Sequence, residues 1–510
     1  MAVSTRRAQG PVGTLRPERA ARANGRAAAA MGLVILTGWL LRLAPWGHGS
    51  LHPDEALYAY WARLIASGRD VALLSVPVDK PPLFLYAVAL AFRLLGPTTP
   101  AARLPGILAS TLSLAVLFAL ARALYGRRVA ALAAALYAAS PFAVSFAPTV
   151  FTDPLLVLWG LVACLLAVRA RWGGAGLALG LAVATKQQGL LFIPLVVALG
   201  GGSARGRPLA RLRSAWARLL IGFAPVYLLI TGWDSLRWRI WPSFWERSWI
   251  AYGGLRLTAP GEWGERAFAW ARLLIELAGS PWLAGAWLLA ASLLLRAIWA
   301  SRHRLNRAAW ADLTIIGYSL GFLLMHWLVS INPWDRYLLP LAPLVALLMA
   351  RGFLLSTARL PDLARRPALA GLSLVLLGAL SRPTAAAALS HLPVGGDHGA
   401  YVGLERAAAW ARGALPADAA LYHTDLGWHL AYYWFDGGPE PRWYADASAL
   451  ATDAARQERP AYVIFSPRGS PPEVARALAA RGMSLSLRYS LTVNGREAFA
   501  VGEIVKEGKP

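Results

Sequence analysis

Membrane-length apolar segments recur along this 510-residue chain as far as residue 387. Each is roughly 15–22 residues long, close to the roughly 20 residues with which a helix crosses a bilayer. A soluble protein with 57% hydrophobic and 15% charged residues would expose large apolar patches, so we predict an α-helical polytopic membrane protein. The segments lie near 30–46, 101–122, 129–147, 151–168, 218–232, 282–300, 308–330, 337–352 and 368–387.

The formal net charge of +24 does not indicate nucleic-acid binding. Its arginines cluster in short loops between apolar segments, as they do in cytoplasmic loops of membrane proteins. Residues 1–29 are rich in Arg, Gly and Ala and predict a disordered basic cytoplasmic tail. The single cysteine, Cys164, lies inside an apolar segment, which excludes disulfides within the chain and argues against thiol chemistry.

The positions of the basic loops predict an orientation. If these loops and the tail are cytoplasmic, the charged residues Asp54, Lys80, Asp153 and Arg336 all lie outside. Residues 172–200 separate two basic loops and are too few for two full spans, so two short helices or a re-entrant hairpin are expected, turning near Lys186. The alternative is one tilted span with a snorkelling Lys186. The hairpin brings the total to about eleven membrane passages.

Two outer loops are expected, at 47–100 and 233–270. The first is predicted to contain two amphipathic helices, near 54–67 and 81–95. In the second, tryptophans spaced by three, four and four residues predict one helical face. That face is typical of an interfacial aromatic belt, with a surface that stacks on sugar or guides a lipid acceptor as the alternative. The tryptophans are Trp238, Trp241, Trp245 and Trp249.

From residue 388 the composition becomes that of a soluble domain, so 30–387 are expected to form the transmembrane domain and 388–510 an extracytoplasmic α/β domain. Short buried strands are predicted at 419–423 and 461–465, a helix at 472–481, and a terminal hairpin turning at Asn494-Gly495. Four polar residues (His423, Asp425, His429 and Asp436) match no tight metal-ligand spacing, and we interpret them as satisfied surface groups.

A few charged residues stand out in the apolar part of the chain. Asp54-Glu55 follows the first apolar segment, Asp79-Lys80 follows later, and Asp153 is the only acid between Lys80 and Asp234. The chain has four lysines against 47 arginines, and only Lys80 and Lys186 lie in the membrane part. Charges beside a membrane are costly to desolvate, so together they predict an active site.

These residue types suit sugar transfer from a polyprenyl phosphate. The phosphate leaves as a stable anion, so the reaction needs a carboxylate to take the acceptor proton and cations to hold the phosphate. Asp54 is expected to be the base, with Glu55 or Asp153 orienting the acceptor or tuning the base. Lys80 is expected to bind the phosphate with help from Arg336.

The chain resembles the polyprenyl-phosphate-dependent glycosyltransferases of the GT-C superfamily, and is most similar to family 39, the protein O-mannosyltransferase and lipid A aminoarabinose transferase group. The resemblance covers roughly 30–350. It implies that Asp54 is catalytic, that Asp153 is the second essential carboxylate, and that Lys80 contacts the lipid phosphate. It also implies inverting transfer without a metal or other cofactor. The matching motifs are Asp54-Glu55, Asp79-Lys80-Pro81-Pro82, Thr152-Asp153 and Arg336-Tyr337-Leu338-Leu339-Pro340.

Together these expectations describe a glycosyltransferase of the plasma membrane with an extracytoplasmic site. Its expected partners are a lipid-linked sugar donor, membrane lipids and a lipid, protein or glycan acceptor. Catalysis is assigned to Asp54, Glu55 and Asp153, and binding of the donor phosphate to Lys80, Lys186, Arg336 and Tyr337. A transporter or flippase is the main alternative, but no internal repeat is evident. A non-catalytic scaffold would not explain the concentration of charges.

Overall fold

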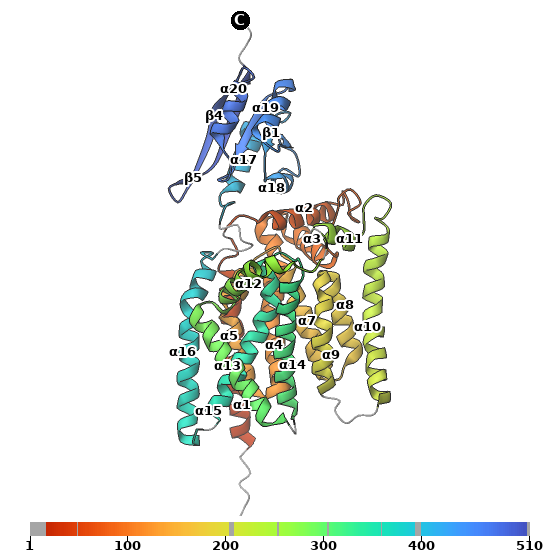
Figure 1. The fold of residues 1–510 in the computed structure, drawn as a ribbon, viewed down its shortest axis with the longest axis vertical. Coiled ribbons are helices and arrows are strands. Elements are labelled where there is room, and N and C mark those ends of the chain that lie inside the picture. The colour runs from red at the N-terminus through yellow and green to blue at the C-terminus, as the bar shows by residue number, and fades with distance from the viewer. Residues whose placement is uncertain are drawn as a thin grey trace, which may run out of the picture.

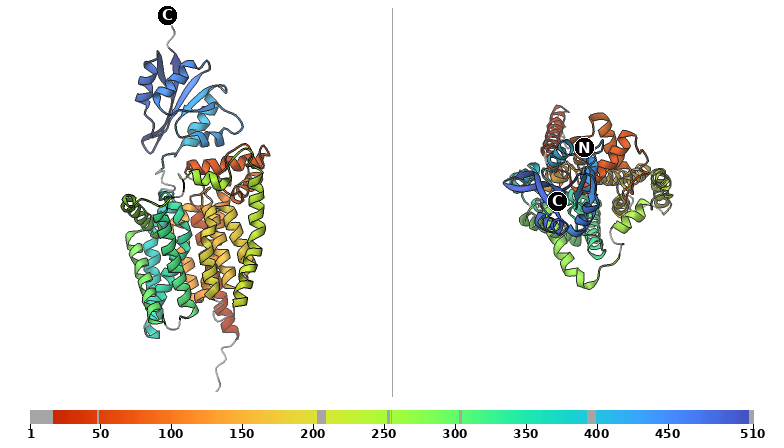
Figure 2. Two further views of the ribbon diagram at one scale, coloured as in Figure 1. Left: turned by 45° about the vertical axis from the view of Figure 1, so that its right-hand side comes forward. Right: turned by 90° about the horizontal axis from the view of Figure 1, so that it is seen from above.

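The computed structural model describes residues 17–506, except 48, 203–208, 252–253, 255, 303–304, 359 and 393–398. Figure 1 shows a bundle of long helices below and a smaller domain with a β-sheet above. A layer of shorter helices covers the upper end of the bundle (Figures 1 and 2). The last bundle helix, α16 (Asp362–Ala388), ends where the composition of the sequence changes.

The bundle helices carry apolar side chains on their outward faces. Leu229 on α10 and Leu374 on α16 are 73% and 71% exposed, as expected for helices surrounded by lipid. Among the described residues, six helices are long and apolar enough to cross a membrane, with five shorter apolar helices beside them. The figure of about eleven passages stays a prediction. The other long helices are α1 (Pro17–Leu43), α4 (Thr99–Tyr125), α7 (Asp153–Val168), α10 (Leu209–Ser235), α13 (Pro281–Ala300), α14 (Arg307–Leu328) and α15 (Ala342–Thr357).

Two predicted segments differ from the structure. Residues 17–29, expected to be disordered, form the start of α1, because their alanines favour helix; residues 1–16 lie outside the described part. The predicted span 129–147 is two helices, α5 (Arg127–Ala138) and α6 (Pro141–Phe146). Ser140 caps the second helix by accepting a hydrogen bond from Ala143 N at 3.3 Å, and Pro141 occupies its first position.

The segment after Arg171 folds as the predicted hairpin of short helices. Helix α8 (Trp172–Thr185) ends before Lys186, and η1 (Gln187–Leu191) leads into α9 (Phe192–Gly202). Gly189 N donates to Lys186 O at 2.8 Å. A Cβ on Gly189 would lie 2.5 Å from the backbone of Ala182, so the turn requires glycine. The single tilted span is therefore wrong.

The layer above the bundle contains the two predicted amphipathic helices, α2 (Pro53–Ser67) and α3 (Leu83–Leu95). It also contains α11 (Phe244–Ala251), η2 (Pro260–Glu262) and α12 (Trp263–Ala278). The predicted helical face of four tryptophans is wrong, because the chain leaves α10 before Trp238 and re-enters helix only after Pro242. Trp238 and Trp249 are nevertheless exposed, as a belt at an interface requires.

The upper domain is an α/β domain with a five-stranded sheet in the order β2-β1-β3-β5-β4. Strand β1 (Ala420–His423) runs parallel to β2 (Glu440–Trp443) and β3 (Ala461–Phe465). The long hairpin of β4 (Met483–Val493) and β5 (Arg496–Lys506) adds antiparallel strands beside β3. The sheet is accompanied by α17 (Leu404–Ala414), α18 (Gly427–Tyr433), α19 (Ala447–Arg456) and α20 (Pro471–Ala479).

The predicted elements of this domain are present, and Asn494 and Gly495 both have positive φ, as a tight hairpin turn needs. Strand β2 was not predicted, because it is a short and mostly exposed edge strand without an apolar pattern. The missed helix α18 is also short and lies against α2.

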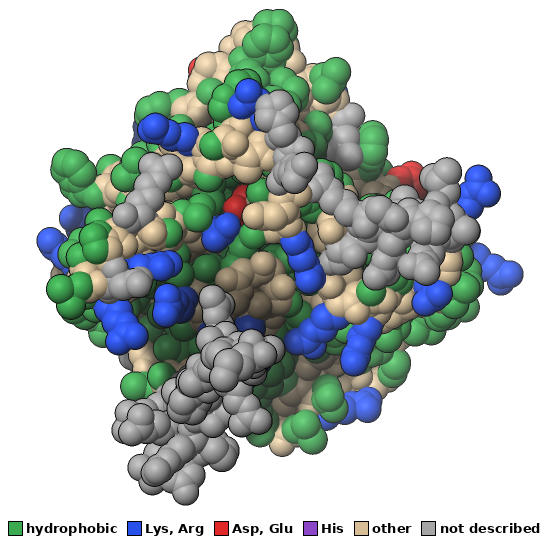
Figure 3. Space-filling model, turned by 90° about the horizontal axis from the view of Figure 1, so that it is seen from below, with side chains coloured by type: hydrophobic (Ala, Val, Ile, Leu, Met, Phe, Trp, Pro, Cys, Tyr) green, Lys and Arg blue, Asp and Glu red, His purple; other side chains and the backbone are tan. Residues whose placement is uncertain are grey.

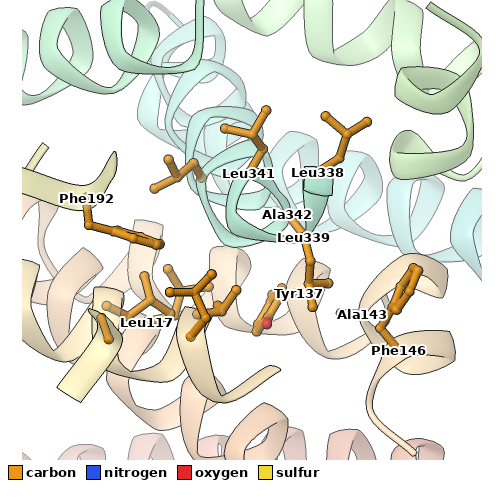
Figure 4. Close-up of a cluster of buried hydrophobic side chains, with 14 of the residues drawn as sticks. Leu117, Tyr137, Ala143, Phe146, Phe192, Leu338, Leu339, Leu341 and Ala342 are labelled. Atoms are coloured by element: carbon orange, nitrogen blue, oxygen red, sulfur yellow. The ribbon is translucent and has the colours of Figure 1, made fainter. Parts of the chain in front are cut away.

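The core of the bundle fixes the segment that carries Arg336. This segment, η4 (Asp335–Leu341), is buried along its whole length. Figure 4 shows its leucines in one apolar cluster with side chains from α4, α5, α6 and α9. The cluster includes Leu117, Tyr137, Phe146, Phe192 and Leu339.

Candidate active site

The two acidic residues at the beginning of α2, Asp54 and Glu55, have different roles. Glu55 is buried, and its Oε2 accepts a hydrogen bond from His52 N at 2.9 Å while its Oε1 accepts one from Val150 N at 2.7 Å. Asp54 N in turn donates to His52 Nδ1 at 3.2 Å. Glu55 therefore caps the helix and ties it to the segment before α7, which leaves Asp54 as the carboxylate available for chemistry.

Asp54 forms an ion pair with Arg336. Arg336 Nη2 donates to Asp54 Oδ2 at 2.7 Å, and the Asp54 side chain remains one-third exposed. Burial raises the pKa of the Asp54 carboxyl, but the charges of Arg336, His52 and Lys80 outweigh burial and hold that pKa below its usual range. Asp54 is consequently an ionised carboxylate at neutral pH.

Asp54 opens onto a cavity of about 240 Å³ beside α2. Three cationic side chains and two carboxylates line the cavity together with several aromatic rings. The cations outnumber the carboxylates, which favours an anionic ligand. The lining residues are Asp54, Leu57, Tyr58, Trp61, Pro77, Asp79, Lys80, Arg247, Trp334, Arg336 and Trp428.

Lys80 reaches this cavity from a loop that is fixed on both sides. Its ammonium pairs with the neighbouring Asp79, and its side chain is 5% exposed. Gln187 Nε2 donates to Asp79 O at 2.8 Å. Further back, the buried Arg237 donates from Nε to Leu73 O at 3.0 Å. These contacts hold the Lys80 ammonium in position at the cavity before any ligand binds.

Arg247, on α11, was missed in the sequence. It lines the cavity and has no ion-pair partner among the described residues, whereas Lys80 and Arg336 each have a carboxylate. Its Nε is buried, and it too lacks a hydrogen-bond partner within the described part of the chain. Nothing in the sequence separated Arg247 from the many other arginines. An unpaired guanidinium at a cavity is well suited to hold a phosphate.

Asp153 and Lys186 pair with each other rather than lining the cavity with Asp54. Lys186 Nζ donates to Asp153 Oδ1 at 2.7 Å, and the two side chains are 5% and 1% exposed. The ammonium also lies 4.6 Å from the ring centroid of Tyr337, and Arg336 lies 5.8 Å from the same centroid. A lone buried acid and a lone buried cation stabilise one another when paired. The predicted residues thus form two groups: one around the cavity at Asp54, where only Asp54 is partly exposed, and a fully buried pair behind Tyr337.

A second cavity, of about 330 Å³, includes His52, Glu55 and Arg103 from the bundle side and Tyr401 from the chain that enters the upper domain. Among the residues that the structure describes, no group of three or more His, Cys, Asp and Glu side chains could hold a metal ion. Of the four polar residues expected at the surface, His423 and His429 are buried instead. His429 bonds to Leu51 O, and Asp436 pairs with Arg63.

The chain is similar to one protein family and to several solved structures. The family model of dolichyl-phosphate-mannose-protein mannosyltransferases matches residues 79–233, which begin at Asp79-Lys80. The structure of ArnT from Cupriavidus metallidurans bound to undecaprenyl phosphate covers 93% of this chain and 97% of its own, with a TM-score of 0.62 at 17% identity. The chain has the GT-C fold. Family model and fold together place it in the GT-C superfamily and indicate a glycosyltransferase.

Two more distant GT-C structures show how widely the fold is shared. An oligosaccharyltransferase from Archaeoglobus fulgidus, tethered to an acceptor peptide, has a TM-score of 0.57 at 13% identity, covering 93% of this chain and 74% of its own. The mycobacterial arabinofuranosyltransferase AftD has a TM-score of 0.53 at 15% identity, covering 93% of this GT-C chain but 41% of its own. No curated protein matches the chain by sequence.

Proposed function

We propose that this GT-C protein moves one sugar from a polyprenyl-phosphate donor to an acceptor hydroxyl at the extracytoplasmic face of a membrane. The observation that carries the proposal is the cavity in which Asp54 faces Lys80, Arg247 and Arg336. A carboxylate and several cations are what such a transfer needs. The cavity is smaller than the roughly 300–1,000 Å³ of pockets for larger ligands, which suits one sugar ring rather than an oligosaccharide.

In the proposed reaction, the Asp54 carboxylate takes the proton of the acceptor hydroxyl as its oxygen attacks the anomeric carbon. The bond between that carbon and the phosphate oxygen breaks, and polyprenyl phosphate leaves with the bonding electrons. Attack from the side opposite the phosphate inverts the anomeric configuration. Lys80 and Arg247 hold the leaving phosphate, while Arg336 keeps Asp54 ionised and oriented. These three cations offer the charge that a divalent metal supplies elsewhere, so we propose transfer that EDTA does not inhibit.

The buried Asp153–Lys186 pair takes a supporting role in this proposal. Through Tyr337, which lies beneath both Lys186 and Arg336, the pair fixes the segment that presents Arg336 to Asp54. Glu55 also has a positioning role, because it fixes the start of α2 and with it the position of Asp54. We therefore assign catalysis to Asp54 and positioning to Glu55, Asp153 and Lys186.

An apolar groove between α9 and α14 suits the lipid part of the donor. It has a volume of about 400 Å³ and is lined almost entirely by apolar side chains. Such a groove matches an isoprenoid chain in polarity, and the chain can pack in it while its phosphate remains with the cations at the upper end of the bundle. The lining residues are Leu191, Pro194, Ala198, Leu313, Thr314, Gly317, Tyr318, Gly321, Phe322 and Met325.

The distribution of charge supports an extracytoplasmic site. Figure 3 shows Lys and Arg side chains around the lower face of the bundle, with few Asp or Glu. Positive charge marks the cytoplasmic side of membrane proteins. Helix α2, which carries Asp54, lies with the upper domain at the opposite end of the bundle (Figure 1). Exposed arginines near the lower ends of helices include Arg122, Arg127, Arg128, Arg169, Arg171, Arg213, Arg302 and Arg307.

The function is tested by mass spectrometry of envelope glycans and glycolipids from cells with the protein, without it, and with Asp54→Asn. The asparagine keeps the size of the side chain but cannot take the proton, so transfer is expected to fall about 100-fold or more. The glycan missing from the deletion strain should also be missing from Asp54→Asn, while polyprenyl phosphate still binds to the purified variant. Normal amounts of that glycan in Asp54→Asn would contradict the assignment of the base. Loss of a flippase would remove the same glycan, so sugar transfer from polyprenyl phosphate to an acceptor by the purified protein separates a glycosyltransferase from a transporter.

The orientation is tested by cysteine labelling in a Cys164→Ser background. Ser448→Cys, exposed on α19, should react with a membrane-impermeant maleimide added outside intact cells. Arg302→Cys, exposed at the end of α13, should react only after permeabilisation. The reverse pattern would place the site on the cytoplasmic side.

A further inference from the structure

The upper domain contributes a wall to the cavity that holds Asp54. Trp428, near the start of α18, is the one lining residue that comes from this domain among those of the described cavity. Its ring lies 6.4 Å from the ring of Tyr60 on α2, yet its side chain is 42% exposed, so packing covers only part of its surface. A large aromatic ring left partly open beside charged groups is available to a ligand.

Trp428 is held in place because α18 is docked firmly on α2. Arg63 donates to Tyr432 O at 2.8 Å and pairs with Asp436 at 2.5 Å, and its guanidinium lies 4.6 Å from the centroid of Phe435. Next to Trp428, His429 Nε2 donates to Leu51 O at 2.8 Å, two residues before the start of α2. The ring of Trp428 is thus fixed relative to Asp54 by contacts on both flanks.

A second aromatic side chain of the cavity has a polar group without a partner. Trp61, on α2, is buried, and its indole N–H has no hydrogen-bond partner among the described residues. A buried donor without a partner is costly and marks a position where a ligand is expected to accept. An aromatic face and an N–H donor beside a carboxylate form a site suited to a sugar ring, which has apolar C–H faces and hydroxyls at its edge.

The position of Trp428 decides which part of the donor it meets. Helix α18 lies above α2, on the side of the layer away from the bundle (Figure 1). The lipid chain has to remain among the membrane helices, and the phosphate is attracted to Lys80, Arg247 and Arg336. The sugar is the remaining part of the donor head, and it is the part that reaches toward the upper domain.

We propose that Trp428 stacks on the ring of the donor sugar while Trp61 donates a hydrogen bond to one of its hydroxyls, so that the C-terminal domain completes the donor site and selects the sugar. This proposal rests on the proposed function. It assigns to the upper domain a direct contact with substrate, in addition to any role in binding the acceptor.

The test compares binding of bare polyprenyl phosphate with binding of polyprenyl phosphates that carry mannose, glucose or arabinose. Native mass spectrometry of the full-length protein in nanodiscs gives Kd for each. In the wild type, at least one sugar should strengthen binding. Trp428→Ala should reduce that gain about five- to tenfold, as expected for the loss of one aromatic contact, and leave Kd of the bare lipid within about twofold. Trp428→Phe should retain part of the gain.

Trp443→Ala is the matched control, because Trp443 is an exposed tryptophan of the same domain that does not line the cavity. It should leave every Kd unchanged. The proposal is overturned if no sugar strengthens binding in the wild type, if Trp428→Ala keeps the full gain, or if it weakens bare and sugar-bearing lipids equally. Failure of the proposed function itself is distinct, since the wild type would then bind none of these lipids.

Discussion

At the scale of single residues, the site separates cations by whether they already have a partner. Lys80 is neutralised by Asp79 and Arg336 by Asp54, while Arg247 faces the cavity without an acidic partner in the described chain. A partnered cation has to share its charge with its carboxylate when a phosphate arrives, whereas an unpartnered one does not. Arg247 should therefore contribute most to holding the donor before reaction.

This difference predicts unequal effects of two alanine variants. Arg247→Ala should raise Kd for bare polyprenyl phosphate at least tenfold, the loss expected for one charge-assisted hydrogen bond of about 1.5–3 kcal/mol. Lys80→Ala should raise it less and lower the turnover more, because its charge is needed as the phosphate leaves. Lys80→Arg should retain partial activity, since the planar guanidinium needs a wider space beside Asp79.

Binding by native mass spectrometry and turnover of the donor check these two effects separately. Arg213→Ala, an exposed arginine near the start of α10, is the control. An Arg247→Ala variant that binds donor as the wild type does would show that the paired cations are sufficient.

The sequence pointed to Asp54 and to two of the three cavity cations, Lys80 and Arg336, but could not divide the charged residues into two groups. Asp54 and Lys80 were found because isolated charges in an apolar chain are costly and conspicuous. Asp153 and Lys186 are equally isolated, yet they neutralise each other, and only tertiary packing decides which charges meet. Arg247 was concealed among many arginines. Trp428 could not be found from the sequence, because no local sequence pattern predicts that its domain packs on α2.

At the scale of elements, helix boundaries could be predicted where capping residues or prolines mark them. The helices near 54–67 and 81–95 were predicted closely, since capping residues and prolines determine where they begin. The predicted tryptophan face failed because α10 ends at Ser235 and α11 begins at Phe244, so Trp238 and Trp241 lie in the non-helical segment between them. Short elements packed by tertiary contacts, such as α18 and β2, carry too few residues for a periodic signal.

The ion pair between α7 and the α8–α9 hairpin gives a test of positioning against catalysis. Lys186→Met leaves Asp153 buried and unpaired, so it should destabilise the protein by about 3–5 kcal/mol. The double variant Asp153→Asn/Lys186→Met removes both charges and should recover most of the melting temperature and part of the activity. Thermal unfolding and donor turnover, measured on the same preparations, distinguish a positioning role of Asp153 from a catalytic one. Recovery of stability with no activity would assign Asp153 to the chemical step.

At the scale of the whole molecule, the proposed active site lies between two parts that each have a hydrophobic core of their own. The bundle supplies Asp54 and the cations, and the upper domain supplies Trp428. Such a site works only while the domain stays docked on α2. The interface combines aromatic contacts, such as Phe92 with Tyr432, and charged ones, in which Arg63 of α2 and Arg69 just beyond it face carbonyls and Asp436 of the domain. Its stability therefore depends in part on the charge of the groups within it.

His429 makes this docking sensitive to pH. Burial lowers the pKa of His429 from 6.5 to about 4, outweighing its hydrogen bond to Leu51 O and the charge of Asp425, while His52 lowers it further. The docked state therefore holds neutral His429, whereas an undocked His429 takes a proton at its ordinary pKa. Docking is at full strength above pH 6.5 and weakens as the pH falls toward 4, by on the order of 1 kcal/mol at pH 5.5.

Hydrogen exchange of the α18 amides, corrected for the intrinsic effect of pH, should consequently show less protection at pH 5.5 than at pH 7.5. His429→Gln is the matched variant, because the amide of glutamine can still donate to Leu51 O but does not titrate in this range. Its α18 protection should change little between the two pH values. The other charged groups at the interface, Arg63, Arg69 and Asp436, are present in both proteins, so their titration cancels in the comparison. Equal loss of protection in both proteins would assign the pH dependence to those groups, and loss in neither would show that His429 stays uncharged in the undocked state as well.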